Sequence, residues 1–85
     1  MLHDKIQYLV LDRRDPSANM ARFYVLAVEA SLFGDTALIR EWGRIGTAGR
    51  RKIELHETEH SAMEALETWL RRKQRRGYVP RFDSR

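Results

Sequence analysis

The sequence contains no cysteine among its 85 residues. It can therefore form no disulfide and no cysteine-ligated zinc site. Because secreted domains of this size often need such cross-links for stability, we expect a reducing, cytoplasmic environment. Long apolar runs are also missing: the run over residues 6–11 is interrupted by Gln7 and followed by Asp12-Arg13-Arg14. We therefore expect neither a signal peptide nor a membrane span.

The chain is too short for two hydrophobic cores, so we expect residues 1–85 to form a single domain with its core over residues 5–80 and a flexible tail at 81–85. A domain of this size buries only about 60–65% of its unfolded surface and has little mass to enclose a deep pocket. This weighs against most enzymes, and we expect no small-molecule substrate.

Positive charge is concentrated in two segments of the sequence. The net charge is +4, yet residues 69–85 carry seven arginines and lysines against the single acid Asp83, and residues 40–52 carry five against Glu41. The remainder of the chain is therefore net negative. An acidic body with two cationic segments is typical of a localised electrostatic surface for an anionic partner.

The first 55 residues have the pattern of short strands. Apolar, β-branched and aromatic residues cluster at 6–11, 23–28, 36–42 and 51–55, and turn-forming residues separate them at 12–19, 31–35 and 43–49. None of these connections is long enough for a crossover helix. We therefore predict an antiparallel meander of three or four strands.

The period changes after Leu55 and predicts one helix. Ala62, Leu66, Trp69 and Lys73 recur at helical spacing, Thr58 or Ser61 can cap the start, and Gly77 can end the helix. The predicted fold class is therefore α+β: an antiparallel sheet of about four strands with one C-terminal helix packed across it. The basic run near the helix end is equally well explained as a solvated end that complements the helix dipole.

Residues 56–60 are His-Glu-Thr-Glu-His, the zinc metalloprotease pattern in which two histidines on one helix bind the metal. We reject this interpretation, because residues 51–55 alternate like a strand and Thr58 is a natural cap, which places His56 before the helix. The extended form of the motif would also need a glycine at Met63 and a histidine at Leu66. We therefore expect no catalytic residue, no metal site and no cofactor.

Trp42 stands out because it alternates with arginines. Leu38, Arg40, Trp42 and Arg44 share one face of their predicted strand, so the indole has guanidinium neighbours on its own side. Cation–π stacking with a partly buried ring is one explanation, and stacking on a base while an arginine binds the adjacent phosphate is another. The glycine-rich turn that follows leads directly into Arg50-Arg51-Lys52.

At these residues the sequence resembles a known family. Trp42-Gly43-Arg44, followed by Ile-Gly-Thr-Ala-Gly over residues 45–49, is similar to the signature of the WGR domain, which occurs in DNA-dependent poly(ADP-ribose) polymerases and in small bacterial proteins. Residues 22–25 look like the aromatic strand before that signature, and the helix with Lys73 and Gly77-Tyr78 looks like the closing helix. The resemblance covers about residues 5–80.

The resemblance implies a sheet with one helix packed across it, no catalytic activity, and contact with DNA near a strand break. Trp42 would be the stacking platform and Arg44 the contact or relay residue. Our leading hypothesis is a non-enzymatic nucleic-acid-binding module that prefers DNA ends, nicks or 5′-phosphates; the alternative is a protein-interaction adaptor that uses the same surface. The candidate contacts are Trp42, Gly43, Arg44, Arg40, Arg50, Arg51 and Lys52, with a secondary basic set of Arg71, Arg72, Arg75 and Arg76.

Overall fold

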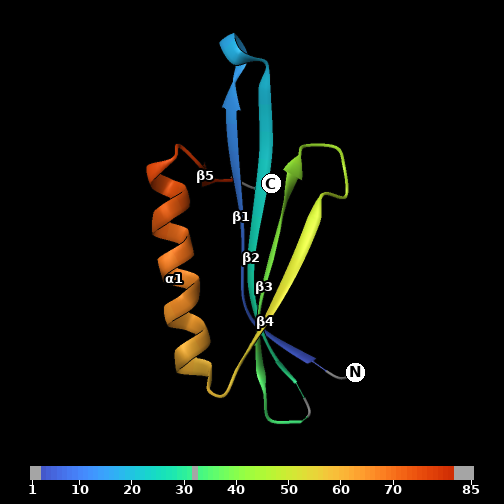
Figure 1. Cartoon of the computed structure of the whole chain (residues 1–85), viewed down its shortest axis with the longest axis vertical. Helices are drawn as coiled ribbons and strands as arrows, with labels where there is room; N and C mark the ends of the chain where they lie inside the picture. Colours follow the sequence, from blue (N-terminus) through green and yellow to red (C-terminus); the bar gives the residue numbers. More distant parts are fainter. Residues whose placement is uncertain (1–2, 32, 82–85) are drawn as a thin grey trace.

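The computed structural model describes residues 3–31 and 33–81, and within β1 the side chains from Ile6 onward. The elements follow in the order β1 (His3–Asp15), a 3-10 turn (Pro16–Ala18), β2 (Met20–Ser31), β3 (Thr36–Arg44), β4 (Arg50–His56), α1 (Glu59–Arg75) and β5 (Val79–Pro80). All strand pairs are antiparallel and form one sheet in the order β4-β3-β2-β1-β5, with α1 against one side (Figure 1). The predicted α+β class is confirmed.

The strands extend beyond their predicted ranges, and one strand is added. β2 spans Met20–Ser31 rather than residues 23–28, and β3 continues to Arg44 rather than ending at residue 42. Residues 12–15, expected to be loop, continue β1 and pair with residues 20–23 of β2, so the hairpin reverses only over Pro16–Ala18 and Asn19, whose φ is 53°. A fifth strand, β5, pairs Val79 with Asp12 and Pro80 with Leu11. Two residues are too short to show an alternation, so the sequence does not predict β5.

Capping fixes both ends of α1 as the sequence predicts. The Thr58 Oγ1 atom accepts a hydrogen bond from the Ser61 amide at 3.0 Å, which satisfies one of the free amides of the first turn. At the other end Gly77 has a φ of +97°, and the amides of Gly77 and Tyr78 donate to the carbonyls of Gln74 and Lys73. This Schellman arrangement turns the chain back toward β1.

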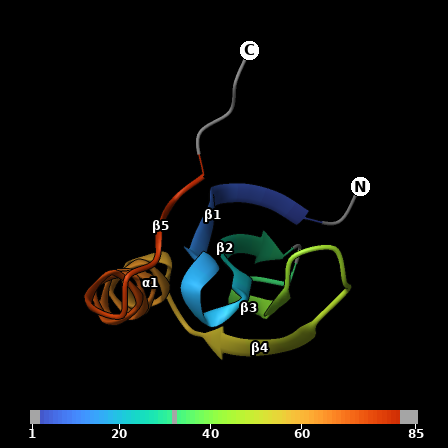
Figure 2. The ribbon, with the colours of Figure 1, turned by 90° about the horizontal axis from the view of Figure 1, so that it is seen from above.

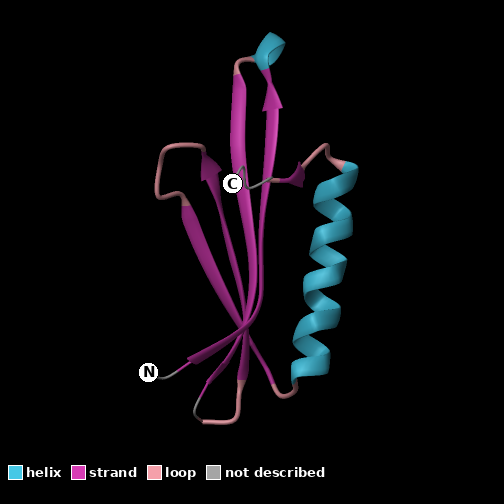
Figure 3. Ribbon diagram, turned by 180° about the vertical axis from the view of Figure 1, so that it is seen from behind, coloured by secondary structure: helices cyan, strands magenta, loops and turns pink. Residues whose placement is uncertain are grey.

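The core lies between α1 and one face of the sheet, which we name the helix-covered face. Leu11, Tyr24, Leu26 and Leu38 point from the sheet into this layer and are at most 2% exposed, and Ala62 and Leu66 of α1 fill the space opposite them. Side chains of residues two apart along a strand point to the same side. α1 lies along one side of the sheet (Figure 3). The apolar positions predicted on α1, Ala62, Leu66 and Trp69, are the ones that pack in this layer.

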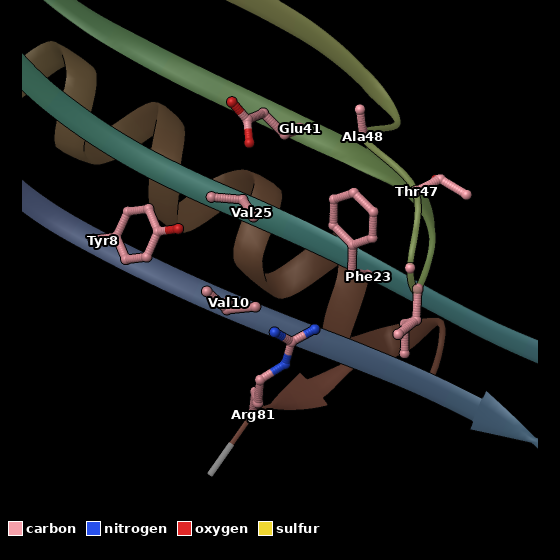
Figure 4. A pocket seen from close by; sticks show the side chains of 10 residues that line it. Tyr8, Val10, Phe23, Val25, Glu41, Thr47, Ala48 and Arg81 are labelled. Carbon is pink, nitrogen blue, oxygen red and sulfur yellow. The ribbon is translucent and has the colours of Figure 1, made fainter. Parts of the chain in front are cut away.

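The opposite side of the sheet, the open face, has no helix over it among the described residues. Seen from above, the sheet curls so that this side is concave (Figure 2). A groove of about 320 Å³ follows it, lined by Tyr8 and Val10 of β1, Phe23 and Val25 of β2, and Glu41 of β3, with Arg81 at its rim (Figure 4). The Arg81 amide donates to the Val10 carbonyl at 2.8 Å, and its guanidinium forms two hydrogen bonds with Asp12.

The expected flexible tail at 81–85 therefore begins with a residue held against β1. Its other residues, 82–85, lie outside the described residues.

Candidate nucleic-acid interface

The register of the sheet assigns the Trp42 side chain to a face. Trp42 lies opposite Tyr24 on β2 and Arg50 on β4, and the next row places Arg40 between Leu26 and Lys52. Directly opposite residues in an antiparallel sheet point to the same side. Because Tyr24 and Leu26 belong to the core, Trp42, Arg40, Arg50 and Lys52 all point to the helix-covered face.

Trp42 is half-buried in an aromatic cluster on that face. Its ring stacks on Tyr24 with centroids 5.9 Å apart and an interplanar angle of 19°, and Tyr24 meets Tyr78 edge to face at 6.0 Å. Offset stacking and edge-to-face contacts are the favoured geometries of aromatic pairs. The ring is therefore fixed in orientation, and its partly buried placement agrees with the first of the two explanations drawn from the sequence.

Arg40 is the buried centre of this cluster. Its side chain is only 8% exposed, its Nη1 donates a 2.9 Å hydrogen bond to the Tyr24 hydroxyl, and its guanidinium lies 3.9 Å from the Trp69 ring centroid and 5.4 Å from that of Trp42. Its Nε has no hydrogen-bond partner among the described residues. This burial leaves Arg40 little surface for a phosphate and gives it a second use, which is to hold both indoles in place.

Lys73 brings a second cation into the cluster from α1. Its ammonium lies 4.5 Å from the Tyr24 ring centroid, 5.7 Å from that of Tyr78 and 5.9 Å from that of Trp69. Desolvation lowers the pKa of Lys73, and the positive charges of Arg76, Arg40 and Arg72 lower it further. A phosphate at this position would relieve that repulsion.

The secondary basic set on α1 divides between two sides of the helix. The Arg72 guanidinium stacks 4.8 Å from the Trp69 centroid, and Arg76 is close enough to Lys73 to affect its pKa. Arg71 instead approaches Glu67 at 3.9 Å, and helical spacing places Arg71 and Arg75 away from the sheet. Only half of the expected set therefore lies beside the aromatic cluster.

The glycines of the signature are required by close backbone approach. A Cβ at Gly43 would lie 2.8 Å from the Gly49 Cα, and one at Gly49 would lie 2.3 Å from the Trp42 carbonyl oxygen at a φ of +72°. The turn is closed by Thr47, whose amide and hydroxyl both donate to the Arg44 carbonyl. This packing presents Arg44 as an exposed side chain at the end of β3.

The three cations that follow the turn are exposed but do not point the same way. Arg50 and Lys52 extend on the helix-covered face, beside Trp42 and Arg40. Arg51 points to the open face, where its Nε lies 3.3 Å from Glu41 Oε2. The structure thus brings two of these three residues together with Trp42.

Two arginines that the sequence does not single out join this site. Arg22 lies opposite Arg44 on β3 and opposite Arg13 on β1, so three arginines form a row across the sheet next to the Tyr24–Trp42 row. The Arg13 side chain also borders Gly77 at the end of α1. These two arginines could be recognised from the pairing of β1 with β2, which places Arg13 opposite Arg22. The turn-forming residues at 12–19 conceal this extension of the hairpin in the sequence.

We use the term basic surface for the cations grouped around Trp42 on the helix-covered face: Arg13, Arg22, Arg44, Arg50, Lys52, Arg72, Lys73 and Arg76. The two cationic segments of the sequence therefore meet in space. Their meeting point is an aromatic cluster rather than a patch of charge alone.

The histidine motif is split between two elements. His56 ends β4 and its Nδ1 lies 2.7 Å from the Ser61 hydroxyl, whereas His60 is on the first turn of α1 and lies 3.3 Å from Glu64. The two histidines are therefore not on one helix, as the protease motif requires. Within residues 3–31 and 33–81, no three metal-ligating side chains gather into a site.

Comparison with known proteins identifies this architecture. The family model of the WGR domain matches residues 8–85, and the chain belongs to this family. An uncharacterized protein of Sinorhizobium fredii, y4dW, is 47% identical over 73 residues, which are 86% of this chain and 36% of that protein. The chain thus spans about a third of the length of this curated relative.

Two general functional properties are associated with the WGR family. The WGR domain is a non-catalytic domain, and in poly(ADP-ribose) polymerases it is linked to nucleic-acid binding. No helix in the described part of the chain is long and apolar enough to cross a membrane.

Proposed function

We propose that this chain is a non-enzymatic nucleic-acid-binding module that binds DNA at ends, nicks or 5′-phosphates through the basic surface. We also propose that it acts in a bacterial cytoplasm, for which the absence of cysteine and the bacterial relative are the support. The observation that carries the proposal is the convergence of the two cationic segments on one aromatic cluster around Trp42.

The arrangement supports a division of roles. Phosphates of the nucleic-acid backbone would be bound by the exposed cations Arg44, Arg50 and Lys52 on the hairpin and by Arg72 and Arg76 on α1, which fixes position without reading sequence. The exposed part of the Trp42 ring would stack on the base or sugar at an interrupted strand, which an uninterrupted duplex does not offer.

In this proposal Arg40 acts through Trp42 and is a positioning residue. Buried between two indoles and bonded to Tyr24, it holds the Trp42 ring at a fixed angle, so less rotational freedom is lost when the ring stacks on a ligand. The close approach of Gly49 to Gly43 and to the Trp42 carbonyl fixes the backbone at Trp42. Arg51, Arg71 and Arg75 would contribute only long-range attraction, because they point elsewhere.

The experiment is an NMR titration with two short duplexes of equal length whose ends are closed by hairpin loops, one of them carrying a single nick. We expect the Trp42 indole signal to shift strongly with the nicked duplex and weakly with the intact one. Affinity should fall with salt, with a log–log slope of about −0.9 per phosphate contacted. Equal shifts with both duplexes would contradict the preference for interruptions.

Trp42→Ala should weaken binding of the nicked duplex far more than that of the intact one, while Arg51→Gln on the open face should change both little. Since Trp42 also packs against Tyr24, Trp42→Phe is the control for folding: it retains a stacking ring and should retain part of the preference. Losses of equal size on both duplexes would reduce the site to non-specific adhesion.

A protein-interaction adaptor is the second candidate. The observation in its favour is that the matched region is only 36% of the S. fredii relative, so other parts of such a protein are available as neighbours of the Trp42 surface. This function predicts no measurable nucleic-acid binding at low ionic strength. It also predicts that Trp42→Ala disrupts a salt-insensitive complex with one protein partner.

A further inference from the structure

β4 is an edge strand with one side unpaired among the described residues. The sheet order places β4 outside β3, and within the described chain its seven residues Arg50–His56 pair with no other strand (Figure 2). Every second amide and carbonyl of such an edge points outward and is available to another strand. Side-chain exposure agrees, since Ile53 is 52% and Leu55 is 69% exposed.

The sequence of β4 is complementary to itself when aligned antiparallel about Ile53. In that register Lys52 of one copy lies opposite Glu54 of the other, and by symmetry Glu54 lies opposite Lys52. Ile53 then meets Ile53, Arg51 meets Leu55, and Arg50 meets His56. Oppositely charged residues directly across from one another stabilise strand pairing, and no like-charged pair of arginine, lysine, aspartate or glutamate occurs.

We propose that β4 is a dimerisation edge that pairs antiparallel with β4 of a second copy of this chain, about a twofold axis through Ile53. The neighbouring registers are disfavoured by charge. Centring the axis on Lys52 places two lysines opposite each other, and centring it on Glu54 places two glutamates opposite each other. Residues directly opposite each other have side chains on the same face of the sheet. A twofold axis perpendicular to the sheet must therefore lie midway between the two copies of one residue, so these are the neighbouring registers.

The fold leaves room for this pairing. α1 lies along one side of the sheet, where it packs mainly on β2 and β3 and contacts β4 to a lesser extent, with His56 Nδ1 2.7 Å from the Ser61 hydroxyl (Figure 3). No described strand pairs with the outer edge of β4. The same twofold axis keeps the helix-covered faces of both copies on one side of a continuous sheet. Two basic surfaces would then face one ligand, so the dimer would bind a long polyanion through both sites.

A charge exchange tests the register on protein free of nucleic acid. Lys52→Glu and Glu54→Lys each place like charges opposite one another twice, and each should weaken the dimer roughly tenfold. The double variant K52E/E54K restores opposite charges in both pairs and should return the dissociation constant to near that of the parent. Sedimentation equilibrium measures all four proteins, and circular dichroism checks that they fold alike.

Two results would overturn the proposal. One is a double variant no better than either single variant, which would show that Lys52 and Glu54 do not face each other across an interface. The other is a parent protein that stays monomeric up to about 1 mM, where a complex of only about −4 kcal/mol would be populated.

The absence of cysteine provides an independent test, because a single introduced cysteine can pair only with its counterpart in another copy. Ile53→Cys should form a covalent dimer under mild oxidation, since the two Cα atoms would be about 4.5–5.5 Å apart in the paired strands, within disulfide range. Arg51→Cys is the matched control: its two copies would be separated by four strand positions, or about 13 Å.

Arg51→Cys should cross-link rapidly only when mixed with Leu55→Cys, which the register places opposite it. Self-linking of the Arg51→Cys variant at the same rate as the Ile53→Cys variant would indicate random collision and contradict the paired edge.

Discussion

The helix-covered face and the open face of the sheet alternate along the same strands but have different chemistry. On the helix-covered face, Arg40 is buried among aromatic rings and the cations of the basic surface gather around them. On the open face, Arg51 approaches Glu41 and Arg81 binds Asp12, so these two cations have acidic partners. The cations of the sequence are therefore separated in two ways: by the segment in which they lie, and by the face of the sheet to which their position along the strand assigns them.

This sorting separates two uses of arginine. Paired with a carboxylate at the surface, arginine contributes little to stability and offers an anion only long-range attraction. Stacked on indoles and beside other cations, as Arg72 is on Trp69, it retains an attraction for phosphate. A substitution on one face should therefore have a different consequence from the matching substitution on the other.

The largest contrast should be in stability. Leu26→Ala removes a side chain with 0% exposure from the layer under α1, which should cost about 2–5 kcal/mol through lost burial and a residual cavity. Leu55→Ala on the open face, at 69% exposure, should change stability by about 0.5 kcal/mol or less. Urea unfolding of both variants measures the difference, and comparable losses would mean that the open face is covered in solution.

The second contrast compares the stability cost of substituting two glycines in the turn between β3 and β4. Gly49→Ala adds a methyl group 2.3 Å from the Trp42 carbonyl and 2.8 Å from the Phe23 ring, at a positive φ, and should cost about 2–3 kcal/mol. Gly46→Ala meets nothing within 4 Å and incurs only the backbone cost of its φ of +97°, about 1 kcal/mol. Urea midpoints compare the two variants, and similar losses would refute the close approach.

The fold is largely predictable because its local signals agree. The strand alternation predicts the existence and order of the four longer strands, although each of them extends beyond its predicted range. The cap at Thr58 and the glycine at Gly77 predict the two ends of α1 that the structure shows. The extension of β1 through residues 12–15 is not predictable, since Asp12, Arg13, Arg14 and Asp15 have low strand propensity and are held by pairing with β2. Tertiary pairing overrides local preference there.

The central residues of the site are predictable from the sequence, but the set of cations that surrounds them is not. The alternation of Arg40, Trp42 and Arg44 assigns them correctly to one face, yet it does not show that α1 covers Arg40 or that Arg51 points to the other side. Arg13 and Arg22 escape prediction because their place depends on the cross-strand register. Which cations converge is decided by pairing between strands, which composition and spacing do not encode.

A smaller contrast is expected in nucleic-acid affinity along α1. Arg72→Gln should weaken binding and reduce the magnitude of the salt slope by about 1, because Arg72 stacks on Trp69 beside the proposed phosphate path. Arg71→Gln, one residue away and 3.9 Å from Glu67, should leave the slope unchanged. Fluorescence anisotropy at several salt concentrations measures both, and equal slopes for the two variants would place the ligand away from the aromatic cluster.

The smallest expected effect is on the pH dependence of stability and concerns the ion pair between Asp12 and Arg81 on the open face. Hydrogen bonding from Arg81 lowers the pKa of Asp12 below its ordinary value of 3.8, despite opposing desolvation, so the folded state binds the Asp12 proton less tightly than the unfolded chain does. The resulting stabilisation is present above the unfolded pKa and is lost as the pH falls through the folded pKa. Asp12→Asn should remove this part of the acid dependence and cost at most about 1 kcal/mol at neutral pH, because Arg81 is solvent-exposed. Urea unfolding from pH 2 to 7 measures it: parent and variant should converge at the acid end, and a constant difference at every pH would show that packing, not charge, holds β5 to β1.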